Sequence, residues 1–268
     1  MKANKLFELL SFPAELIELL QKHPHDLTEQ KIRYFSAKMR NPKEFEKTAK
    51  ELRETLNNDV NGYKILNTLL EIACDTYETY KIKGISENVF IQTQKCFLRF
   101  ALEHKESFGV FGFDRFYWVG RQLSLSLFRI GELEYEMVTL EGKKAISLHI
   151  PSDAVLTDEN VDNSLNEARE FIKTYYPEYN DAIYYCSSWL LSPALKNLLN
   201  EDSKILKFAS RFKVTKHEEE PEDYKIWVYG KLNIEPKDFA EKTSLQRNIK
   251  KHVLAGGKIG ESFGILIE

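Results

Sequence analysis

The sequence predicts an α+β protein, in which a helical N-terminal domain is followed by a mixed α/β domain. In the first part, apolar residues recur every three or four positions, the spacing that places them along one side of a helix. In 126–138, apolar and polar residues alternate instead, which is typical of a half-buried strand. Between the two parts, 106–114 combines glycines and aromatic residues with a loss of periodicity. We therefore place the domain boundary there and divide the chain into residues 1–108 and 109–268.

Residues that start or end helices support the helical reading of the first domain. Asp26 to Glu29 has the spacing of a capping box, and Pro42 suits the first position of a helix, where its missing N–H is not needed. Gly84 is suited to a left-handed helix end. The predicted helices are 3–10, 13–22, 27–39, 43–56, 61–82 and 86–104.

The second domain is predicted to run strand, strand, helix, strand, helix, strand, strand, helix, strand. Glu141 and Gly142 form the tight turn between the first two strands. A strand–helix–strand unit comes next, and its two strands should be parallel with a right-handed crossover. The segments 212–216 and 224–231 read as a second hairpin around an acidic loop. The other predicted strands are 126–138, 144–150, 182–189 and 263–267, and the helices begin at 157, 193, 203 and 243.

Composition narrows the possible functions. With 268 residues, 43% of them hydrophobic, the chain can bury a sizeable core. The net charge of -3, with lysines interleaved with glutamates, gives no basic stripe for nucleic acid. No uncharged run of about 18 apolar residues occurs, so we expect no membrane span. The N-terminal apolar run is interrupted by Glu8, Glu15 and Glu18, which argues against a signal peptide.

Cysteine and histidine usage argues against disulfides and metal sites. Three cysteines, odd in number and far apart, suit a reducing cytoplasm. Neither a CxxC pair nor an HExxH motif is present, so we expect no metal. The expected partner is a small-molecule ligand, and the oligomeric state is not predicted.

Several segments together resemble one protein family. They are similar to segments of a bacterial family of acyltransferases that pair a helical N-acyltransferase N-terminal domain with a GNAT-like C-terminal domain. The resemblance covers essentially the whole chain and is most specific within 128–257. It implies a GNAT-like second domain that transfers an acyl group from an acyl thioester, acetyl-CoA or another acyl-CoA, to an amine. The segments that carry it are 128–136, 148–153, 161–172, 175–179, 186–199, 203–212 and 243–257.

The resemblance also implies where acyl-CoA would bind. In GNAT enzymes the pyrophosphate meets free N–H groups and the helix dipole at the start of the main helix. The equivalent turn here, 149–160, includes Ile150 and Ser152, has no glycine and carries three acidic residues that would repel a phosphate. Two hypotheses therefore stand: an acyltransferase, and a non-catalytic GNAT-like module that binds a small molecule or peptide.

Direct acyl transfer requires a base, an acid and a donor to the carbonyl oxygen. Glu132, Glu134 and Glu136 alternate with apolar residues and share one strand face, with Glu134 in the middle as the candidate base. The same pattern arises on a solvated sheet face. Arg129 would bind a substrate carboxylate or pair with one of these glutamates.

The stretch 184–193, YYCSSWLLSP, lies where the cleft should open. The resemblance places Ser187 against the acyl carbonyl and Ser188 beside the pantetheine arm, although Ser188 also suits entry into a helix. Cys186 has no histidine near it in the sequence; it either lines the substrate site or is a buried strand residue. Trp189 either walls the cleft or closes the core.

Two further residues have both functional and structural readings. His149, at the end of a strand, would act as a base or hydrogen-bond donor to substrate, or would be a satisfied structural histidine. Arg247 would bind a ligand carboxylate or phosphate, or form a surface ion pair. A third hypothesis, a protein that binds a partner through its helical domain, rests on aromatic residues such as Tyr34, Phe35 and Tyr80.

Overall fold

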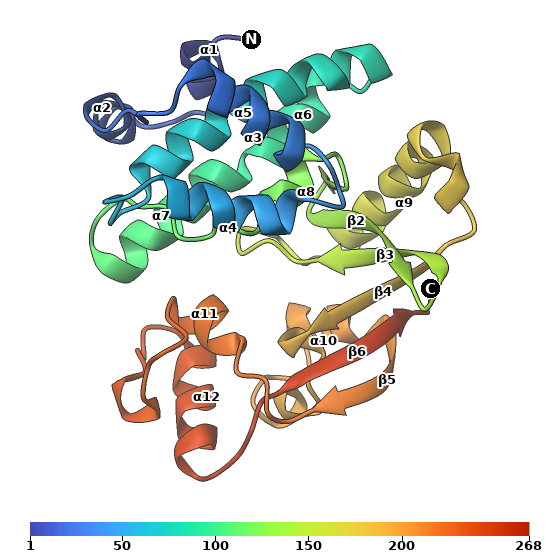
Figure 1. Cartoon of the computed structure of the whole chain (residues 1–268). Coiled ribbons are helices and arrows are strands. Elements are labelled where there is room, and N and C mark those ends of the chain that lie inside the picture. Colours follow the sequence, from blue (N-terminus) through green and yellow to red (C-terminus); the bar gives the residue numbers. More distant parts are fainter. Residues whose placement is uncertain (268) are drawn as a thin grey trace. The chain divides into compact units, whose positions relative to one another are not determined.

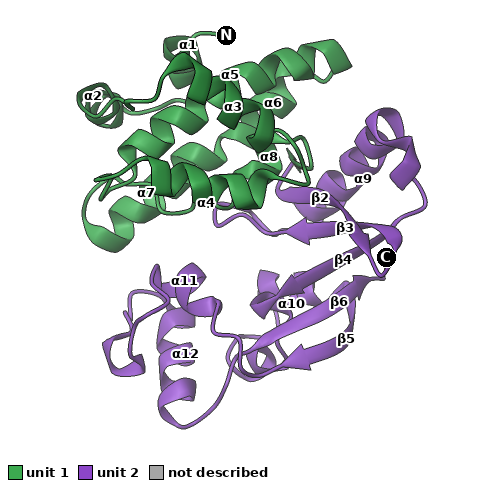
Figure 2. Cartoon of the chain, viewed as in Figure 1, with its two compact units in different colours: residues 1–129 green, residues 130–268 purple. Residues whose placement is uncertain are grey.

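The computed structural model describes residues 1–267, which form two compact units, residues 1–129 and the residues from Ile130 onward (Figure 2). The boundary predicted at residue 108 coincides with the end of a helix, α7 (Cys96–Phe108). The segment after it belongs to the helical unit, because Thr76 Oγ1 donates a hydrogen bond to the carbonyl of Leu123 at 3.2 Å. The glycines and the loss of periodicity in 106–114 therefore mark the end of a helix, and the helical unit continues beyond them to Arg129.

The helical unit is built around its longest helix, α5, which contacts α1, α2, α3 and α6 (Figure 1). Its predicted apolar side is confirmed: Leu66, Leu69 and Ala73 are fully buried. Gly84 ends α5 in the left-handed conformation with φ 70°, as predicted. The helices of this unit are α1 (Ala3–Leu9), α2 (Ala14–Lys22), α3 (Glu29–Met39), α4 (Phe45–Thr55), α5 (Tyr63–Lys83), α6 (Glu87–Gln94), α7 and α8 (Gly120–Leu123), so the helix predicted at 86–104 is two helices that meet at Lys95.

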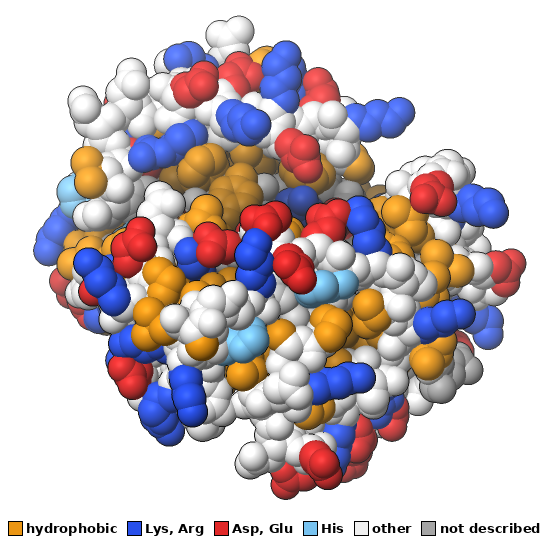
Figure 3. Space-filling view, turned by 90° about the horizontal axis from the view of Figure 1, so that it is seen from below, with side chains coloured by type: hydrophobic (Ala, Val, Ile, Leu, Met, Phe, Trp, Pro, Cys, Tyr) orange, Lys and Arg blue, Asp and Glu red, His pale blue; other side chains and the backbone are white. Residues whose placement is uncertain are grey.

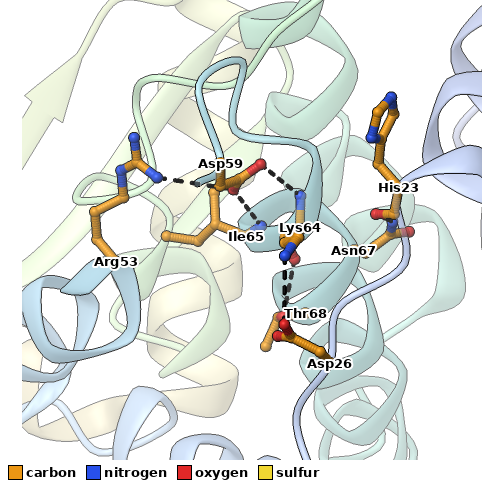
Figure 4. A network of polar contacts seen from close by, with 8 residues as sticks. All are labelled: His23, Asp26, Arg53, Asp59, Lys64, Ile65, Asn67 and Thr68. Atoms are coloured by element: carbon orange, nitrogen blue, oxygen red, sulfur yellow. Dashed lines mark hydrogen bonds and ion pairs between the residues drawn. The ribbon is translucent and has the colours of Figure 1, made fainter. Parts of the chain in front are cut away.

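A polar network holds the start of α5 (Figure 4). The buried carboxylate of Asp59 accepts hydrogen bonds from the backbone N–H groups of Lys64 at 3.0 Å and Ile65 at 2.9 Å. These are N–H groups at a helix start that lack a partner within the helix. Lys64 Nζ lies 3.4 Å from Asp26 Oδ2. The capping box predicted from Asp26 is therefore wrong, and Thr28 caps α3 instead.

The sheet has six strands in the order β1-β2-β3-β4-β6-β5; β2 to β6 lie in the α/β unit, and the boundary between the units falls within β1. The strand–helix–strand unit is confirmed: β3 and β4 are parallel neighbours, joined through α9. The strands are β1 (Leu127–Ile130), β2 (Leu133–Leu140), β3 (Lys143–His149), β4 (Ile183–Ser188), β5 (Phe212–Glu218) and β6 (Glu261–Leu266). The α-helices are α9 (Asp158–Tyr175), α10 (Lys204–Ser210), α11 (Tyr224–Tyr229) and α12 (Ser244–Leu254), and the 3₁₀ helices are η1 (Pro177–Tyr179), η2 (Trp189–Leu191), η3 (Pro193–Asn197) and η4 (Pro236–Asp238).

The single strand predicted at 126–138 is wrong, because a turn divides it into β1 and β2. Gly131 takes a positive φ of 61°, which side chains rarely adopt. A Cβ at this position would lie 3.0 Å from the side chain of Ser164. Glu132 consequently lies in the turn and leaves the strand pattern of Glu134 and Glu136.

The second predicted hairpin is also wrong, because the segment 224–231 forms helix α11. Its run of aromatic and branched residues fits a strand or a buried helix equally well by periodicity. The Tyr224 and Tyr229 rings lie 6.4 and 4.0 Å from the Phe239 ring, and Gly230 ends the helix with φ 75°. β5 pairs with β6 instead.

No helix in residues 1–267 is long and apolar enough to cross a membrane. The same residues contain no cluster of three or more His, Cys, Asp or Glu side chains that could hold a metal ion. On the face drawn in Figure 3, basic and acidic side chains are intermixed, so neither sign of charge forms a continuous area there.

Candidate active site

The parallel strands β3 and β4 separate before they end. Their pairing stops at Ser147 and Tyr185, although β3 continues to His149 and β4 to Ser188. Figure 1 shows the two strands diverging toward their carboxyl ends. Beyond the last pair, the backbone edge of each strand that faces the opening is not paired with the other strand. Such edges can hydrogen-bond to an extended ligand as a further strand would.

Strand register decides which side chains line this opening. Residues directly opposite each other on paired strands share a face of the sheet. Glu134 lies opposite His149, and Glu136 lies opposite Ser147. We call the face that carries these residues the polar face. Its residues near the opening are Glu134, Glu136, Ser147, His149, Tyr185, Ser187, Glu261 and Phe263.

The β3 side of the opening carries a histidine–carboxylate pair. His149 Nε2 lies 2.8 Å from Glu136 Oε2, and both side chains are half-buried. Glu134 is only 2% exposed, so the solvated-face alternative does not hold for it. Glu132 lies apart in its turn, where it accepts a hydrogen bond from the N–H of Val155 at 2.8 Å. The three glutamates that sequence analysis grouped thus have three different environments.

The β4 side carries a serine–carboxylate pair. The hydroxyl of Ser187 donates a hydrogen bond of 2.5 Å to Oε1 of Glu261 on β6. Sequence analysis missed Glu261, which is far from Ser187 along the chain and precedes the predicted last strand. The alternation of Glu261, Phe263 and Ile265 was a signal for it, because those residues share one face of β6. The rings of Tyr185 and Phe263 stack beside the pair at 4.8 Å.

Cys186 lies on the opposite face of β4 from Ser187, because successive side chains alternate. It is fully buried, and burial raises the pKa of its thiol. Trp189 is 9% exposed and packs in an apolar cluster that includes Tyr224 and Phe239. The structure brings neither Cys186 nor Trp189 to the polar face.

Ser188 and the turn before α9 lie at the ends of the separating strands. Ser188 Oγ accepts a hydrogen bond from the N–H of Leu190 at 3.1 Å and so caps a short helix. Ile150 is half-buried and packs against the same apolar cluster as Trp189, whereas Ser152 is exposed in the turn. The turn thus carries one apolar and one polar side chain beyond β3.

The acidic start of α9 is paired with an arginine. Arg211 Nη2 lies 3.2 Å from Asp158 Oδ1, and Arg211 also donates to the carboxylate of Asp162. The hydrogen bond from Arg211 holds the pKa of Asp162 below its ordinary value. Part of the negative charge expected to repel a phosphate is therefore offset by Arg211.

The two remaining predicted arginines are Arg129 on β1 and Arg247 on α12. Arg129 is buried in the helical unit, and its backbone N–H donates to Thr93 Oγ1 at 3.0 Å. Arg247 donates from Nη1 to the carbonyls of Glu241 at 2.7 Å and Lys242 at 3.3 Å. It thereby ties the loop before α12 to that helix.

Together, the polar face holds two hydrogen-bonded pairs, one on each of the separating strands. Each pair contains a carboxylate that can accept a proton, and His149 can accept or donate one. An extended ligand between β3 and β4 would therefore have groups for proton transfer on both sides.

Comparison with known proteins identifies the family and the fold. A model of the N-acyltransferase N-terminal domain matches residues 1–125, and a model of the GNAT-like C-terminal domain matches residues 127–266. No curated protein matches the sequence. The fold is similar to the crystal structure of an acyltransferase in complex with decanoyl-CoA and teicoplanin, with a TM-score of 0.72, 18% identity and coverage of 99% of each chain. A mutant acyltransferase in complex with octanoyl-CoA gives a TM-score of 0.73 at 18% identity, over 100% of this chain and 99% of that chain.

The matched ranges follow the two compact units, which divide after Arg129. The GNAT-like model spans the whole described sheet and the opening between β3 and β4. The chain belongs to the family that joins an N-acyltransferase N-terminal domain to a GNAT-like C-terminal domain.

Proposed function

We propose that this protein is an N-acyltransferase that transfers an acyl group from an acyl-CoA to an amine. The observation that carries the proposal is the separation of β3 and β4 beyond Ser147 and Tyr185, with a proton-transfer pair on each strand. In this proposal the extended pantetheine arm lies between the two strand edges. Ile150, Ser152 and Ser188 then line the carrier, because they lie where the strands end.

The donor is proposed to be a medium-chain acyl-CoA. Structures of similar fold are complexes with octanoyl-CoA and decanoyl-CoA, which supports these donors over acetyl-CoA as the first to test. Because Arg211 pairs with Asp158 and Asp162, the start of α9 is less repulsive to a pyrophosphate than its sequence implied. The three free, buried cysteines suit a reducing cytoplasm, where we place the enzyme.

The chemistry requires one group that accepts a proton from the amine and one that supplies a proton to the leaving thiolate. Ser187 and Glu134 are the predicted catalytic residues. We keep Ser187 in contact with the reacting atoms, because it is exposed at the end of β4. Glu134 is buried opposite His149, so we assign it to positioning that histidine.

The proposal is tested by binding and by turnover. Thermal unfolding is followed with CoA, acetyl-CoA, octanoyl-CoA and decanoyl-CoA, since a ligand at about 100 times its Kd adds about 2.7 kcal/mol to the free energy of unfolding. Release of the CoA thiol is then measured with primary amines. A melting shift with thiol release supports an acyltransferase. A shift without release for any amine supports the alternative, a non-catalytic GNAT-like binding module, and no shift contradicts CoA as the carrier.

A further inference from the structure

The carboxylate beside Ser187 belongs to Glu261, which is not among the site residues predicted from the sequence. Glu261 begins β6, and Ser187 is opposite Phe263, two residues further along that strand. The Ser187 hydroxyl and the Glu261 carboxylate are therefore diagonal neighbours on the polar face, and they hydrogen-bond at 2.5 Å. Ser187 is exposed and Glu261 is partly exposed, so a substrate can reach the pair.

We infer that Glu261 receives, through the hydroxyl of Ser187, the proton that the acceptor amine loses. This inference rests on the proposed function. A serine hydroxyl has one hydrogen and two lone pairs, and here the hydrogen is directed to Glu261. The Ser187 oxygen is left as an acceptor, which suits the N–H of an amine rather than the acyl carbonyl oxygen. The donor role first expected for Ser187 is thereby replaced by an acceptor role.

The two pairs of the polar face differ in the direction in which they can move a proton. An ionised carboxylate accepts hydrogen bonds and has no proton to give, so the Ser187–Glu261 pair can only take one up. An imidazole can also donate one, so His149 of the Glu136–His149 pair suits the leaving thiolate. The order of strands in the sheet thus places the proton-accepting pair on the β4 side of the opening and the proton-donating pair on the β3 side.

The step balances as follows in atoms and electrons. The amine nitrogen forms a bond to the acyl carbon, and the carbon–sulfur bond breaks with its electron pair on sulfur. The nitrogen gives its proton to the Ser187 oxygen while the Ser187 hydrogen passes to Glu261. The thiolate takes a proton from His149, which regains one from solvent, and Glu261 returns its proton to solvent.

Glu261 has a neighbouring strand on each side, β5 and β4. Glu218 lies opposite it on the neighbouring strand β5 and is ion-paired with Lys216. On β4 the facing group is Ser187 itself. Glu218 is therefore the matched control, since it is an exposed carboxylate on the same row of the sheet whose partner is a lysine.

The test uses the full chain, decanoyl-CoA, and the amines glucosamine, glycinamide and putrescine. Glu261→Gln is expected to lower kcat about a hundredfold with the KM for decanoyl-CoA unchanged. Glu261→Asp should restore part of the rate. Ser187→Ala should resemble Glu261→Gln, and the double variant should be no slower than either, because both belong to one relay. Glu218→Gln should match the parent.

A parental kcat in Glu261→Gln, or additive losses in the double variant, would overturn the inference while leaving the acyltransferase proposal in place. If decanoyl-CoA binds the parent but none of the three amines releases CoA thiol, the inference and the proposed function both fall. If decanoyl-CoA does not bind at all, the proposed carrier is wrong before Glu261 is tested.

Discussion

The two faces of the sheet in the α/β unit are made of alternate residues of the same strands, yet they differ in chemistry. The polar face holds the Glu136–His149 and Ser187–Glu261 pairs. The opposite face is covered by α9, and we call it the helix-covered face. It buries residues such as Tyr135, Leu148 and Cys186. The difference indicates that the helix-covered face stabilises the fold and that the polar face is available for chemistry. Substitutions on the helix-covered face should therefore lower stability, and substitutions on the polar face should lower the rate of acyl transfer.

The largest effect is expected from the helix-covered face. Tyr135 is 1% exposed, and its hydroxyl hydrogen-bonds to Ser164 Oγ on α9 at 2.9 Å. Tyr135→Ala should lower the free energy of unfolding by about 3–5 kcal/mol, because it leaves a cavity where an aromatic ring packed. Urea unfolding measures this change. Tyr135→Phe, the control, should cost about 1 kcal/mol, since it removes only the hydrogen bond.

A loss below about 1 kcal/mol in Tyr135→Ala would contradict the assignment of this face to stability. So would a loss of acyl transfer in Tyr135→Phe with the free energy of unfolding unchanged.

On the polar face the expected loss is in rate. His149→Gln should lower kcat about a hundredfold, because the glutamine amide can hydrogen-bond but cannot transfer a proton. The free energy of unfolding should change by about 1 kcal/mol or less, since the His149 side chain is only half-buried. Thiol release and urea unfolding are measured on the same preparation. If His149→Gln lost kcat and free energy of unfolding by the same fraction, the proposed difference between the two faces would be contradicted.

Cys186 tests the same contrast within one strand, because it neighbours Ser187 but lies on the helix-covered face. Burial raises the pKa of its thiol, so little thiolate forms and little is accessible near neutral pH. An Ellman-type disulfide reagent should leave Cys186 unmodified in the folded protein and react with it after unfolding in urea. Cys186→Ala should keep the parental kcat. Fast modification of Cys186 that abolishes thiol release would place it in the active site.

The smallest expected change in stability concerns Arg211, at the end of α10, which pairs with Asp158 and Asp162 at the start of α9. Arg211 lowers the pKa of Asp162 from its ordinary 3.8, so the pair stabilises the fold where Asp162 is ionised in both states. That contribution is present above about pH 4 and is lost as the pH falls through the lower folded-state pKa. Arg211→Gln should be slightly less stable than the parent at pH 7, and this difference should shrink by pH 2. A difference that grows on acidification would contradict the sign.

Local signals in the sequence account for much of the fold. Gly84 ends α5, Thr157 caps α9 and the capping box at Thr243 begins α12, each within a few residues of the pattern that predicted it. The parallel pairing of β3 and β4 follows from the strand–helix–strand order. Where prediction failed, the local signal was ambiguous: 224–229 is a mainly aromatic and branched run interrupted only by Lys225, and the backbone at Gly131 depends on close packing against Ser164.

The site was less accessible to prediction than the fold. His149 and Ser187 were found because they end strands. Glu136, the partner of His149, lies on the adjoining strand of the predicted hairpin, whereas the partner of Ser187 depends on register, which a single sequence does not specify across distant strands. Glu261 is 74 positions from Ser187, and only the pairing of β4 with β6 brings the two together. The pairing of Arg211 with the acidic start of α9 likewise became visible only through the packing of α10 near α9.

The most direct test of the central claim, that acyl-CoA binds between the separating strands, is hydrogen–deuterium exchange with and without decanoyl-CoA. Peptides covering 146–154 and 184–190 should exchange more slowly with the ligand, since the backbone N–H groups at those edges gain a partner. Peptides from α5 (Tyr63–Lys83), which lies in the other unit, serve as the internal reference. Protection confined to the two strand ends is the predicted result. Binding of decanoyl-CoA that protects other segments and leaves both strand ends unchanged would contradict the account.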